Sequence, residues 1–336
     1  MCFMRFIKKV KRYLGDVVRT VSKVERSKGS RLKIFCDIIY CQLRFHVSFR
    51  EYLLYQFYNY KNCYRKNFML KYHQVHKYKR VNNAYITFSK YGFYEKVSEF
   101  FQREIILLPS CGEQKFLDFV KKHDTVILKP NKGSGGKGIR ILKYENDEQI
   151  LQCFRDIKRE TVCEELIRQH KVLSDLNPYS VNTLRIVSLR HDENNIEIIS
   201  ATLKSGARYD SFVDNLSSGG IIALVDIESG IVSTFGVDAN GKHYTHHPIT
   251  ETQIIGMNIP YWSKAIALIK NAHRQLNENR ILGWDIAITE TGVDIVEANS
   301  APGPNIMQMA DLVPKGEKIL KVLNNKKNQV YKFSFK

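Results

Sequence analysis

The sequence predicts an α+β protein, in which a domain of mixed strands and helices follows a basic, mainly helical N-terminal region. Glycine is absent from residues 31 to 91 and proline from residues 1 to 108, which favours helices in that part. From about residue 115, short β-branched runs alternate with Gly, Asn and Asp, which is typical of strands joined by turns. Two kinds of structure therefore follow each other along the chain.

Positive charge is concentrated at the two ends of the chain. Residues 1–90 contain 21 Lys and Arg against four Asp and Glu, and residues 315–336 contain seven against one. Between them, 24 basic residues stand against 29 acidic ones. A basic end can meet anionic lipid, nucleic acid or an anionic substrate. We accordingly divide the chain into a basic helical region, a central domain and a basic tail, with bounds 1–84, 85–315 and 316–336.

Residues 3–21 have the pattern of a basic amphipathic helix, because apolar residues recur at helical spacing and most Lys and Arg fall on the other side. The apolar set is Phe3, Phe6, Ile7, Val10, Leu14, Val17, Val18 and Val21. One interpretation packs this helix on its own domain, and the other places it at the interface of an anionic membrane. Binding of nucleic acid is not expected, because residues 1–80 contain no Gly-hinged helix-turn-helix, zinc-ligand spacing or RNP-type strand.

Three observations predict the compartment. No window approaches the ~18 uncharged apolar residues that a membrane span needs, and the N-terminus lacks the continuous apolar stretch of a secretory signal. The seven cysteines include no C-x-x-C pair, which is typical of reduced thiols and not of a disulfide or zinc framework. We expect a cytoplasmic protein, peripheral on the inner face of the membrane if the first helix lies there.

The remaining pattern predicts nine strands and three further helices, with no internal repeat between them. The expected strands are 125–129, 139–143, 161–164, 183–190, 196–204, 220–227, 231–236, 284–289 and 293–298. The expected helices are 113–122, 146–157 and 261–278.

The last two expected strands flank a short glycine-containing turn, which indicates a β-hairpin. Its simplest register pairs Thr289 with Val293. Asp285 then lies opposite Glu297, and Asn299 shares the face of Glu297. Opposed carboxylates at ~5 Å repel each other unless a cation lies between them. Two carboxylates and an amide oxygen suit a hard ion such as Mg²⁺, and the alternative is a solvated edge hairpin with incidental acids.

A glycine-rich loop joins two expected strands upstream. It follows Lys129 and runs from Lys132 to Gly138, with four glycines and two lysines. Glycines let backbone N–H groups approach phosphates, and lysines add positive charge. The loop is not a Walker A motif, because no Gly-Lys-Ser/Thr opens a helix, and not a dinucleotide fingerprint, because a strand follows it. Such a loop is a weak signal for phosphate binding by itself and a stronger one beside a metal hairpin.

Two further strands contain charged residues. Glu164 and Glu165 end one of them and precede Ile167, so this segment is either an exposed strand end or a hinge whose backbone contacts a purine. Arg185 lies inside an apolar strand, where an unpaired guanidinium is costly to bury. Its partner is either a structural carboxylate or a phosphate or substrate carboxylate, because a guanidinium binds each of them in a bidentate way.

The order of these features resembles the ATP-grasp superfamily, and the finer pattern resembles sugar-transfer-associated ATP-grasp proteins over roughly residues 85–310. The likeness is carried by Lys129-Pro130 with the Gly-rich loop, by Ser180-Val181-Asn182-Thr183-Leu184-Arg185-Ile186, by Val213-Asp214-Asn215 with Gly219-Gly220, by His247-Pro248 and by Gly283-Trp284-Asp285-Ile286-Ala287. In this superfamily, two α+β subdomains grip ATP, and an acyl phosphate is made with Mg²⁺ bound.

The resemblance implies a role for each residue of interest. The phosphates of ATP would contact Lys90, Lys129 and a lid formed by Lys132, Gly133, Ser134, Gly135, Gly136, Lys137 and Gly138. Adenine would lie beside Glu164, Glu165 and Ile167. The γ-phosphate or the substrate carboxylate would contact Arg185 and Lys204. The Mg²⁺ ligands would be Asp285, Glu297 and Asn299. One departure is that Lys171 stands where many ATP-grasp ligases have a ribose-binding acid, which would leave ribose to Gln169 or His170.

The implied activity is a ligase reaction that uses ATP and Mg²⁺. ATP phosphorylates a small-molecule carboxylate, and an amine or another nucleophile, such as a sugar-linked acceptor, attacks the acyl phosphate. The family name implies a setting in bacterial surface-polysaccharide or sugar-conjugate synthesis. Two alternatives stay open: a non-catalytic protein that binds nucleotide or an anionic polymer on this fold, and an ATP-grasp kinase, for which Asp214 is the candidate base. The sequence does not identify the carboxylate or the acceptor.

Overall fold

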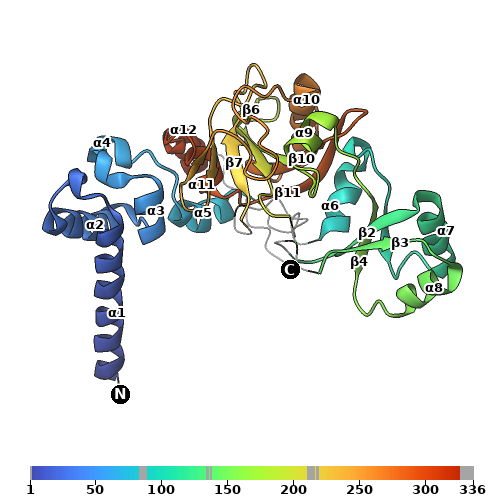
Figure 1. Ribbon diagram of the computed structural model, residues 1–336, viewed down its shortest axis with the longest axis horizontal. Helices are drawn as coiled ribbons and strands as arrows, with labels where there is room; N and C mark the ends of the chain where they lie inside the picture. The colour runs from blue at the N-terminus through green and yellow to red at the C-terminus, as the bar shows by residue number, and fades with distance from the viewer. Residues whose placement is uncertain are drawn as a thin grey trace. The chain divides into compact units, whose positions relative to one another are not determined.

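The structure is a computed structural model that describes residues 2–82, 89–133, 136, 138–209, 216 and 219–325, with the side chains of 2–6 and 79 left out. Helices and two separate sheets make up the chain, which confirms the α+β class (Figure 1). Two compact units are present, one of residues 1–80 and 303–329 and one of residues 81–302 and 330–336. The sequence places the corresponding boundaries at 84/85 and 315/316. Among the described residues, none of the helices has the length and apolar character of a membrane span.

The first unit is built from helices. They are α1 (Cys2–Lys23), α2 (Arg31–Phe45), α3 (Phe49–Leu54), α4 (Asn62–Arg65), α5 (Lys71–His76), α11 (Pro304–Gln308) and α12 (Gly316–Asn324). Two of them begin at serine caps: the side chain of Ser30 accepts a backbone N–H of α2, and that of Ser48 accepts one of α3. Glu51 completes a capping box with Ser48. The helical character expected of this region is therefore confirmed.

A partly buried ion pair and a largely aromatic core hold the first unit together. Arg65 donates to both carboxylate oxygens of Asp37, at 2.7 and 2.8 Å, and its Nε donates to the carbonyl of Phe57 at 2.9 Å. A guanidinium whose donors are satisfied in this way can be buried at tolerable cost. The largest fully buried side chains of the unit are Ile38, Tyr52, Tyr55, Phe57, Phe68, Met69, Leu70 and Tyr78.

The C-terminal helices α11 and α12 are part of this unit. The Tyr55 hydroxyl donates to Asn305 Oδ1 at 2.6 Å, and the Gly316 N–H donates to the carbonyl of Asn67 at 2.7 Å. A Cβ at residue 316 would lie 2.3 Å from that carbonyl oxygen, so the contact requires glycine. The segment that the sequence separates as a basic tail thus begins with a helix that buries Ile319 and Leu323.

The second unit contains two antiparallel sheets, of which the smaller has the strand order β1-β4-β2-β3. Its strands are β1 (Ile105–Leu108), β2 (Thr125–Pro130), β3 (Arg140–Lys143) and β4 (Thr161–Glu165), and its helices are α7 (Glu113–His123) and α8 (Asp147–Arg155). Both helices cover the same face (Figure 1). There, Phe116, Val120 and Ile150 form one core with Val126 and Leu128. Helix α6 (Lys90–Val97) precedes this sheet in the chain.

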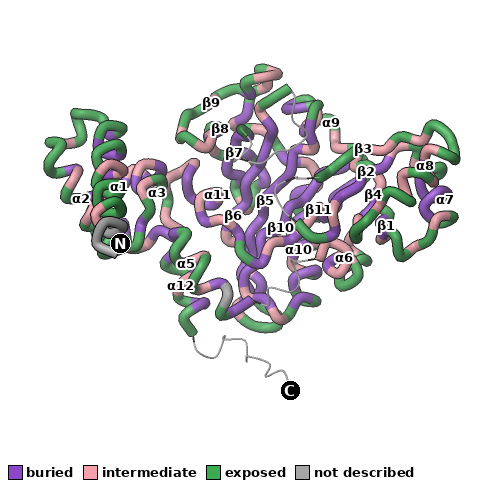
Figure 2. Tube along the Cα trace, turned by 90° about the horizontal axis from the view of Figure 1, so that it is seen from below, coloured by how far each residue is buried: buried purple, intermediate pink, exposed green. Residues whose placement is uncertain are grey.

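The larger sheet has the order β11-β10-β5-β6-β7-β8-β9. Its strands are β5 (Thr183–Arg190), β6 (Ile196–Ser205), β7 (Ile221–Leu224), β8 (Gly236–Asp238), β9 (His243–Tyr244), β10 (Ile281–Ile288) and β11 (Val293–Asn299). Two helices accompany it, α9 (Lys171–Leu176) and α10 (Trp262–Gln275). The central strands are buried (Figure 2). Ile186 and Trp284 share a core with Ile269 of α10, so the alternate residues Arg185 and Asp285 face the other side.

Most of the expected elements occur, and the differences are local. The strand expected at 231–236 is wrong, because this segment makes only isolated bridges before β8 begins at Gly236. Strand β10 begins at Ile281, three residues before the expected start. Strand β1 was not expected, because a four-residue apolar run before Pro109 does not show whether it is strand or helix.

Gly316→Ala tests whether the contact of α12 with Asn67 is rigid. Alanine in place of glycine ordinarily stabilises a helix by about 1 kcal/mol. Here the added Cβ would displace a backbone carbonyl, and we expect a net loss of about 1–3 kcal/mol, seen as a lower midpoint of thermal unfolding by circular dichroism. Gly303→Ala in the same unit is the matched control, because a Cβ there meets nothing within 4 Å. Equal midpoints for the two variants would contradict a rigid contact.

Candidate functional site

Four adjacent strands of the larger sheet bring the predicted charged residues into one row. Glu297 of β11 is the Cα partner of Asp285 of β10, and Asp285 is also the partner of Arg185 of β5. Lys204 of β6 is paired with Thr183, two residues from Arg185 along β5 and on the same face. Two carboxylates are therefore followed by two cations across β11, β10, β5 and β6.

The cations of this row bind Asp285. Arg185 Nε lies 2.6 Å from Asp285 Oδ1, Arg185 Nη2 lies 2.7 Å from Oδ2, and Lys204 Nζ lies 3.4 Å from Oδ2. All three residues are buried. Burial favours the neutral acid, but the charges of Arg185 and Lys204 outweigh it and hold the pKa of Asp285 well below its usual range. The partner of Arg185 in this structure is therefore a carboxylate, and it belongs to one of the residues expected to bind metal.

Glu297 is less well compensated. Burial and the charge of Asp285 raise its pKa, and Asn299 Nδ2 donates to Glu297 Oε1 at 3.3 Å. A cation at Glu297 and Asn299 would offset this negative charge, and an all-oxygen set fits Mg²⁺. Asp285 can take part, because a carboxylate oxygen that accepts from Arg185 keeps a lone pair. The described residues contain no group of three or more His, Cys, Asp and Glu that could hold a metal, so the candidate consists of two acids and an amide.

The opposition of Asp285 and Glu297 is as expected, but the register that produces it is not. Val293 pairs with Ile288 and not with Thr289, so the predicted pairing is wrong by one residue near the turn. A β-bulge between Asp285 and Ile286 takes up one extra residue of β11 and restores the alignment. Bulges of this kind have no clear local sequence signal, whereas strand alternation does predict that Glu297 and Asn299 share one face.

Gly283 provides room for the arginine of the row. A Cβ on Gly283 would lie 2.7 Å from Pro302 Cβ and 3.3 Å from Arg185 Cδ. On the opposite face of the same strand, the indole N–H of Trp284 donates to Ser188 Oγ at 2.8 Å. The Gly-Trp-Asp sequence therefore supplies space, an anchor and an acid at successive positions of β10.

A second charged group centres on Glu164 of β4. Its Oε2 accepts from Lys129 Nζ at 2.8 Å and from Arg103 Nε at 2.9 Å. Burial would raise the pKa of Glu164, but the charges of Lys129 and Arg103 lower it to about 2. Arg103 also donates from Nη1 to Asp294 Oδ2 and to the carbonyl of Ile295, both at 2.6 Å. This one buried guanidinium thus joins the smaller sheet to β11 of the larger sheet.

Arg103 had no role in the sequence analysis. The signal that could have found it is Asp294, an acid on the apolar face of the expected hairpin, which needs a buried cation. The identity of that cation has no local signature, because Arg103 and Asp294 are 191 residues apart in the chain.

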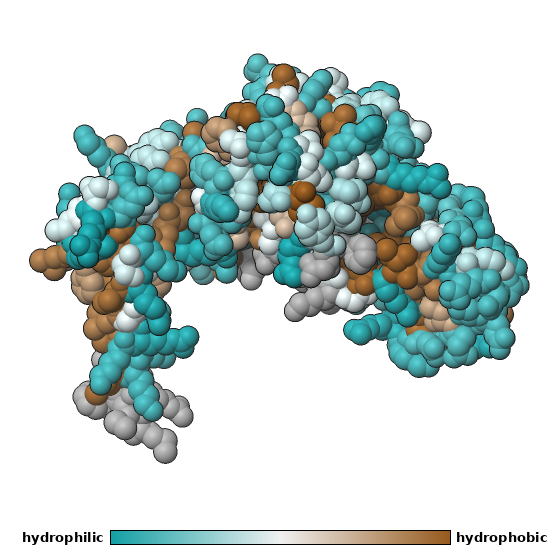
Figure 3. Space-filling model, in the orientation of Figure 1, coloured by the Kyte–Doolittle hydropathy of each residue, from teal (hydrophilic) through white to brown (hydrophobic). Residues whose placement is uncertain are grey.

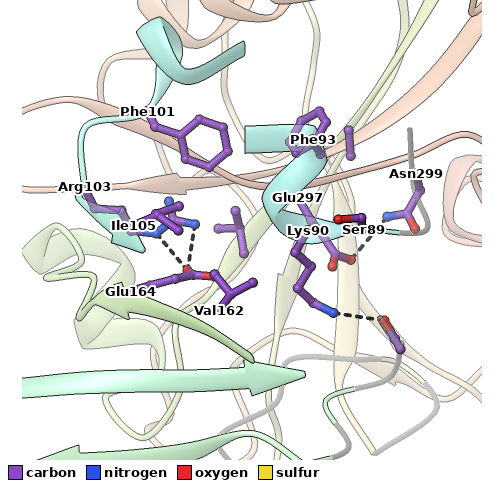
Figure 4. A pocket seen from close by; sticks show the side chains of 13 residues that line it. Ser89, Lys90, Phe93, Phe101, Arg103, Ile105, Val162, Glu164, Glu297 and Asn299 are labelled. Carbon is purple, nitrogen blue, oxygen red and sulfur yellow. Dashed lines mark hydrogen bonds and ion pairs between the residues drawn. The ribbon is translucent and has the colours of Figure 1, made fainter. Parts of the chain in front are cut away.

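Residues of both sheets and of α6 line one cavity (Figure 4). Arg103 and Glu164 lie at one side of it, and Lys90, Glu297 and Asn299 at the other. Lys90 Nζ donates to the carbonyls of Pro130 and Gly133, each at 3.0 Å. Burial lowers the pKa of Lys90, Glu297 opposes this shift, and Lys129 adds to it. The described lining includes neither Glu165 nor Ile167, whereas Glu164 is part of it.

The glycine-rich loop is described in part. Gly133, Gly136 and Gly138 have φ values of 137°, 74° and 77°, which favour glycine, and Lys132 is exposed. A Cβ on Gly138 would approach Pro130 Cγ to 3.0 Å. Ser134, Gly135 and Lys137 lie outside the described residues, as do Asp214 and Asn215.

With this geometry in view, comparison identifies the family. The sequence matches the sugar-transfer-associated ATP-grasp family over residues 63–327. The chain belongs to this family. A search of curated proteins found no match.

Solved structures of ATP-grasp ligases and related synthetases also resemble the chain. N5-carboxyaminoimidazole ribonucleotide synthetase from Thermotoga maritima is 15% identical, with a TM-score of 0.41 over 71% of this chain and 49% of that one. D-alanine–D-alanine ligase from Bacillus anthracis is 14% identical, with a TM-score of 0.40 over 71% and 66%. The ATP-grasp ligase PsnB, solved with its minimal precursor, is 12% identical, with a TM-score of 0.43 over 70% and 59%. The matched part thus spans about half to two thirds of these proteins.

Arg103→Met tests the bridge between the two sheets. It leaves Glu164 with Lys129 alone and Asp294 with no guanidinium, so we expect a loss of about 3 kcal/mol or more in the free energy of unfolding. Urea denaturation followed by tryptophan fluorescence measures this loss, because Trp262 and Trp284 both lie in the second unit. The control is Arg155→Met, whose partner Glu113 is 43% exposed and whose loss should cost at most about 1 kcal/mol. Similar losses in both variants would mean that Arg103 does not join the sheets.

Proposed function

We propose that the protein is a Mg²⁺- and ATP-dependent ligase that activates a carboxylate as an acyl phosphate for attack by an amine or another nucleophile. Membership of the sugar-transfer-associated ATP-grasp family supports ATP as the substrate and a setting in bacterial surface-polysaccharide or sugar-conjugate synthesis. The observation that carries the proposal is the cavity in which Lys90, Glu164, Glu297 and Asn299 meet. Charged groups of both signs that meet in one cavity are typical of a site for a charged ligand.

In this proposal, the smaller sheet holds the nucleotide. Lys90 and Lys129 supply positive charge for the phosphates, and the N–H groups near Gly133 and Gly138 supply donors. The cavity has a volume of about 70 Å³, whereas sites for small-molecule ligands usually hold about 300 Å³ or more. ATP therefore requires the cavity to widen, and Glu164 and Lys129 are the groups it would reach as it enters.

Mg²⁺ would be held by Glu297 and Asn299 together with Asp285. Once bound, the ion supplies positive charge that neutralises the phosphate oxygens during transfer. The protein residues fix the position of these ligands, since Asp285 is held by Arg185 and Asn299 donates to Glu297.

Arg185 and Lys204 would orient the substrate carboxylate. Arg185 and Lys204 both contact Asp285, so Asp285 stays paired with one of them if the other turns to the substrate carboxylate. A planar guanidinium can hold a carboxylate in a fixed orientation toward the γ-phosphate, which favours transfer by positioning. In this mechanism the chain supplies positioning and charge, and no protein nucleophile is needed.

Two alternatives make different demands. A non-catalytic nucleotide-binding or polymer-binding protein has no need for Asp285, Glu297 and Asn299 to converge. A kinase that phosphorylates a sugar hydroxyl needs a base beside its acceptor, and its candidate, Asp214, lies outside the described residues. ADP release in the presence of Mg²⁺ and a panel of amino acids and nucleotide-sugars separates the ligase from the binding protein.

Glu297→Gln tests the metal site. The change removes one of two opposed, buried carboxylates, so we expect the metal-free protein to be at least as stable as the wild type at pH 7. Mg²⁺-dependent ADP release should be abolished, because a ligand charge is lost. Unfolding midpoints with and without Mg²⁺ give a second readout: the ion should raise the wild-type midpoint and leave that of the variant unchanged. Wild-type turnover by Glu297→Gln would rule out this assignment.

The identity of the reaction is tested by trapping the acyl phosphate. With the carboxylate found in the panel, ATP, Mg²⁺ and hydroxylamine, we expect a hydroxamate, with ADP and free phosphate released in equal amounts. Arg185→Ala should reduce hydroxamate formation by about 100-fold or more, with a much smaller effect on ATP affinity. Arg185→Lys keeps the charge and loses the bidentate contact, so its rate of hydroxamate formation should lie between those of the wild type and Arg185→Ala. A stable phosphorylated sugar without hydroxamate or free phosphate would show a kinase instead.

A further inference from the structure

We propose that the N-terminal half of α1 binds an anionic membrane surface, with its apolar face in the bilayer interface. This inference goes beyond the proposed reaction and depends only on the first unit. Of the two interpretations of residues 3–21, packing on the domain applies to the C-terminal half of the helix. We assign membrane contact to the N-terminal half.

The apolar stripe of α1 is longer than the helices that cover it. Toward the C-terminal end, Val17 and Val21 are buried, at 0% and 7% exposure, where α1 packs on α2 and α3. Two turns earlier on the same stripe, Val10 and Leu14 are 39% and 41% exposed. Residues 10, 14, 17 and 21 follow helical spacing, so one continuous face is covered at one end and open at the other. Within the part of the chain that is described, the core of the unit explains only the covered end.

The remaining sides of the open half are basic. Lys8, Lys9, Lys11 and Arg12 are all exposed, and the one acid in α1, Asp16, is paired with Arg19. Figure 3 shows hydrophobic side chains along one side of α1 and hydrophilic ones along the other. Each exposed lysine or arginine is attracted to anionic headgroups, and its aliphatic stem can extend from the interface while the apolar stripe is buried.

This combination fits a lipid surface better than a nucleic acid. The phosphate backbone of a nucleic acid attracts the cations, but exposed valine and leucine add nothing to that binding. An anionic bilayer binds the cations through its headgroups and buries the apolar side chains in its interface, as it does for an interfacial amphipathic helix. Binding should be reversible and weakened by salt, because screening removes the charge contribution.

Point variants test this inference more sharply than deletion of the helix, which would also remove Val17 and Val21 from the core. With the full chain, we expect co-sedimentation with phosphatidylcholine vesicles that contain phosphatidylglycerol, and none with phosphatidylcholine alone. Val10→Ser with Leu14→Ser should weaken binding at least tenfold. The matched control is Ile141→Ser with Ile231→Ser, which are 48% and 41% exposed in the second unit and should change binding less than twofold.

The charge contribution has its own pair of variants. Lys8, Lys9 and Lys11 changed to Gln should weaken binding tenfold or more at low salt, whereas the exposed Lys115, Lys143 and Lys158 changed to Gln should not. Leu14→Trp reports insertion directly, by a blue shift of its fluorescence on anionic vesicles. Binding that survives Val10→Ser with Leu14→Ser, absence of a blue shift, or displacement of the protein from vesicles by duplex DNA would each overturn the proposal.

Discussion

The buried guanidinium of Arg103 is the constraint on which the second unit depends. It lies between Glu164 of the smaller sheet and Asp294 of the larger one, and its contacts of 2.6 to 2.9 Å leave little freedom on either side. A charge so deeply buried is tolerated only when partners and hydrogen bonds offset its desolvation. Glu164 lines the cavity, and Asp294 belongs to β11, whose residues 296–299 also line it, so the same contact ties together the two walls of the candidate site.

The charged row of the larger sheet follows the same electrostatic rule with a different result. Asp285 is buried with two cations within reach, and its pKa falls, whereas burial and the neighbouring carboxylate of Asp285 raise the pKa of Glu297. Adjacent positions of one hairpin are thus driven in opposite directions by their surroundings. Such a contrast is common where a protein prepares a place for a ligand that is itself charged. The proposed cation at Glu297 would offset the less compensated of the two acids.

The sequence predicts the fold class and the opposition of Asp285 and Glu297, but not the contacts that join the two sheets. Strand alternation places Glu297 and Asn299 on one face, but Asp285 joins them only because the bulge of β11 compensates for a turn that is one residue from the predicted register. Arg103 could not be found in this way, because its partners depend on how two sheets meet. Glu164 was expected beside adenine, and its ion pairs with Lys129 and Arg103 have no signal in the local pattern. Periodicity likewise predicts α1, but it does not show how much of its apolar face is covered by other helices.

A pattern common to both charged groups bears on how they could bind substrate. Glu164 is paired with Lys129 and Arg103, and Asp285 is paired with Arg185 and Lys204, so each buried carboxylate has two cations. If Lys129 or Lys204 turns to a phosphate or a substrate carboxylate, the arginine keeps the acid paired, and no buried carboxylate is left alone. With a single partner, the same movement would expose the full cost of an isolated carboxylate. The second cation therefore keeps Glu164 or Asp285 paired if Lys129 or Lys204 turns toward a ligand.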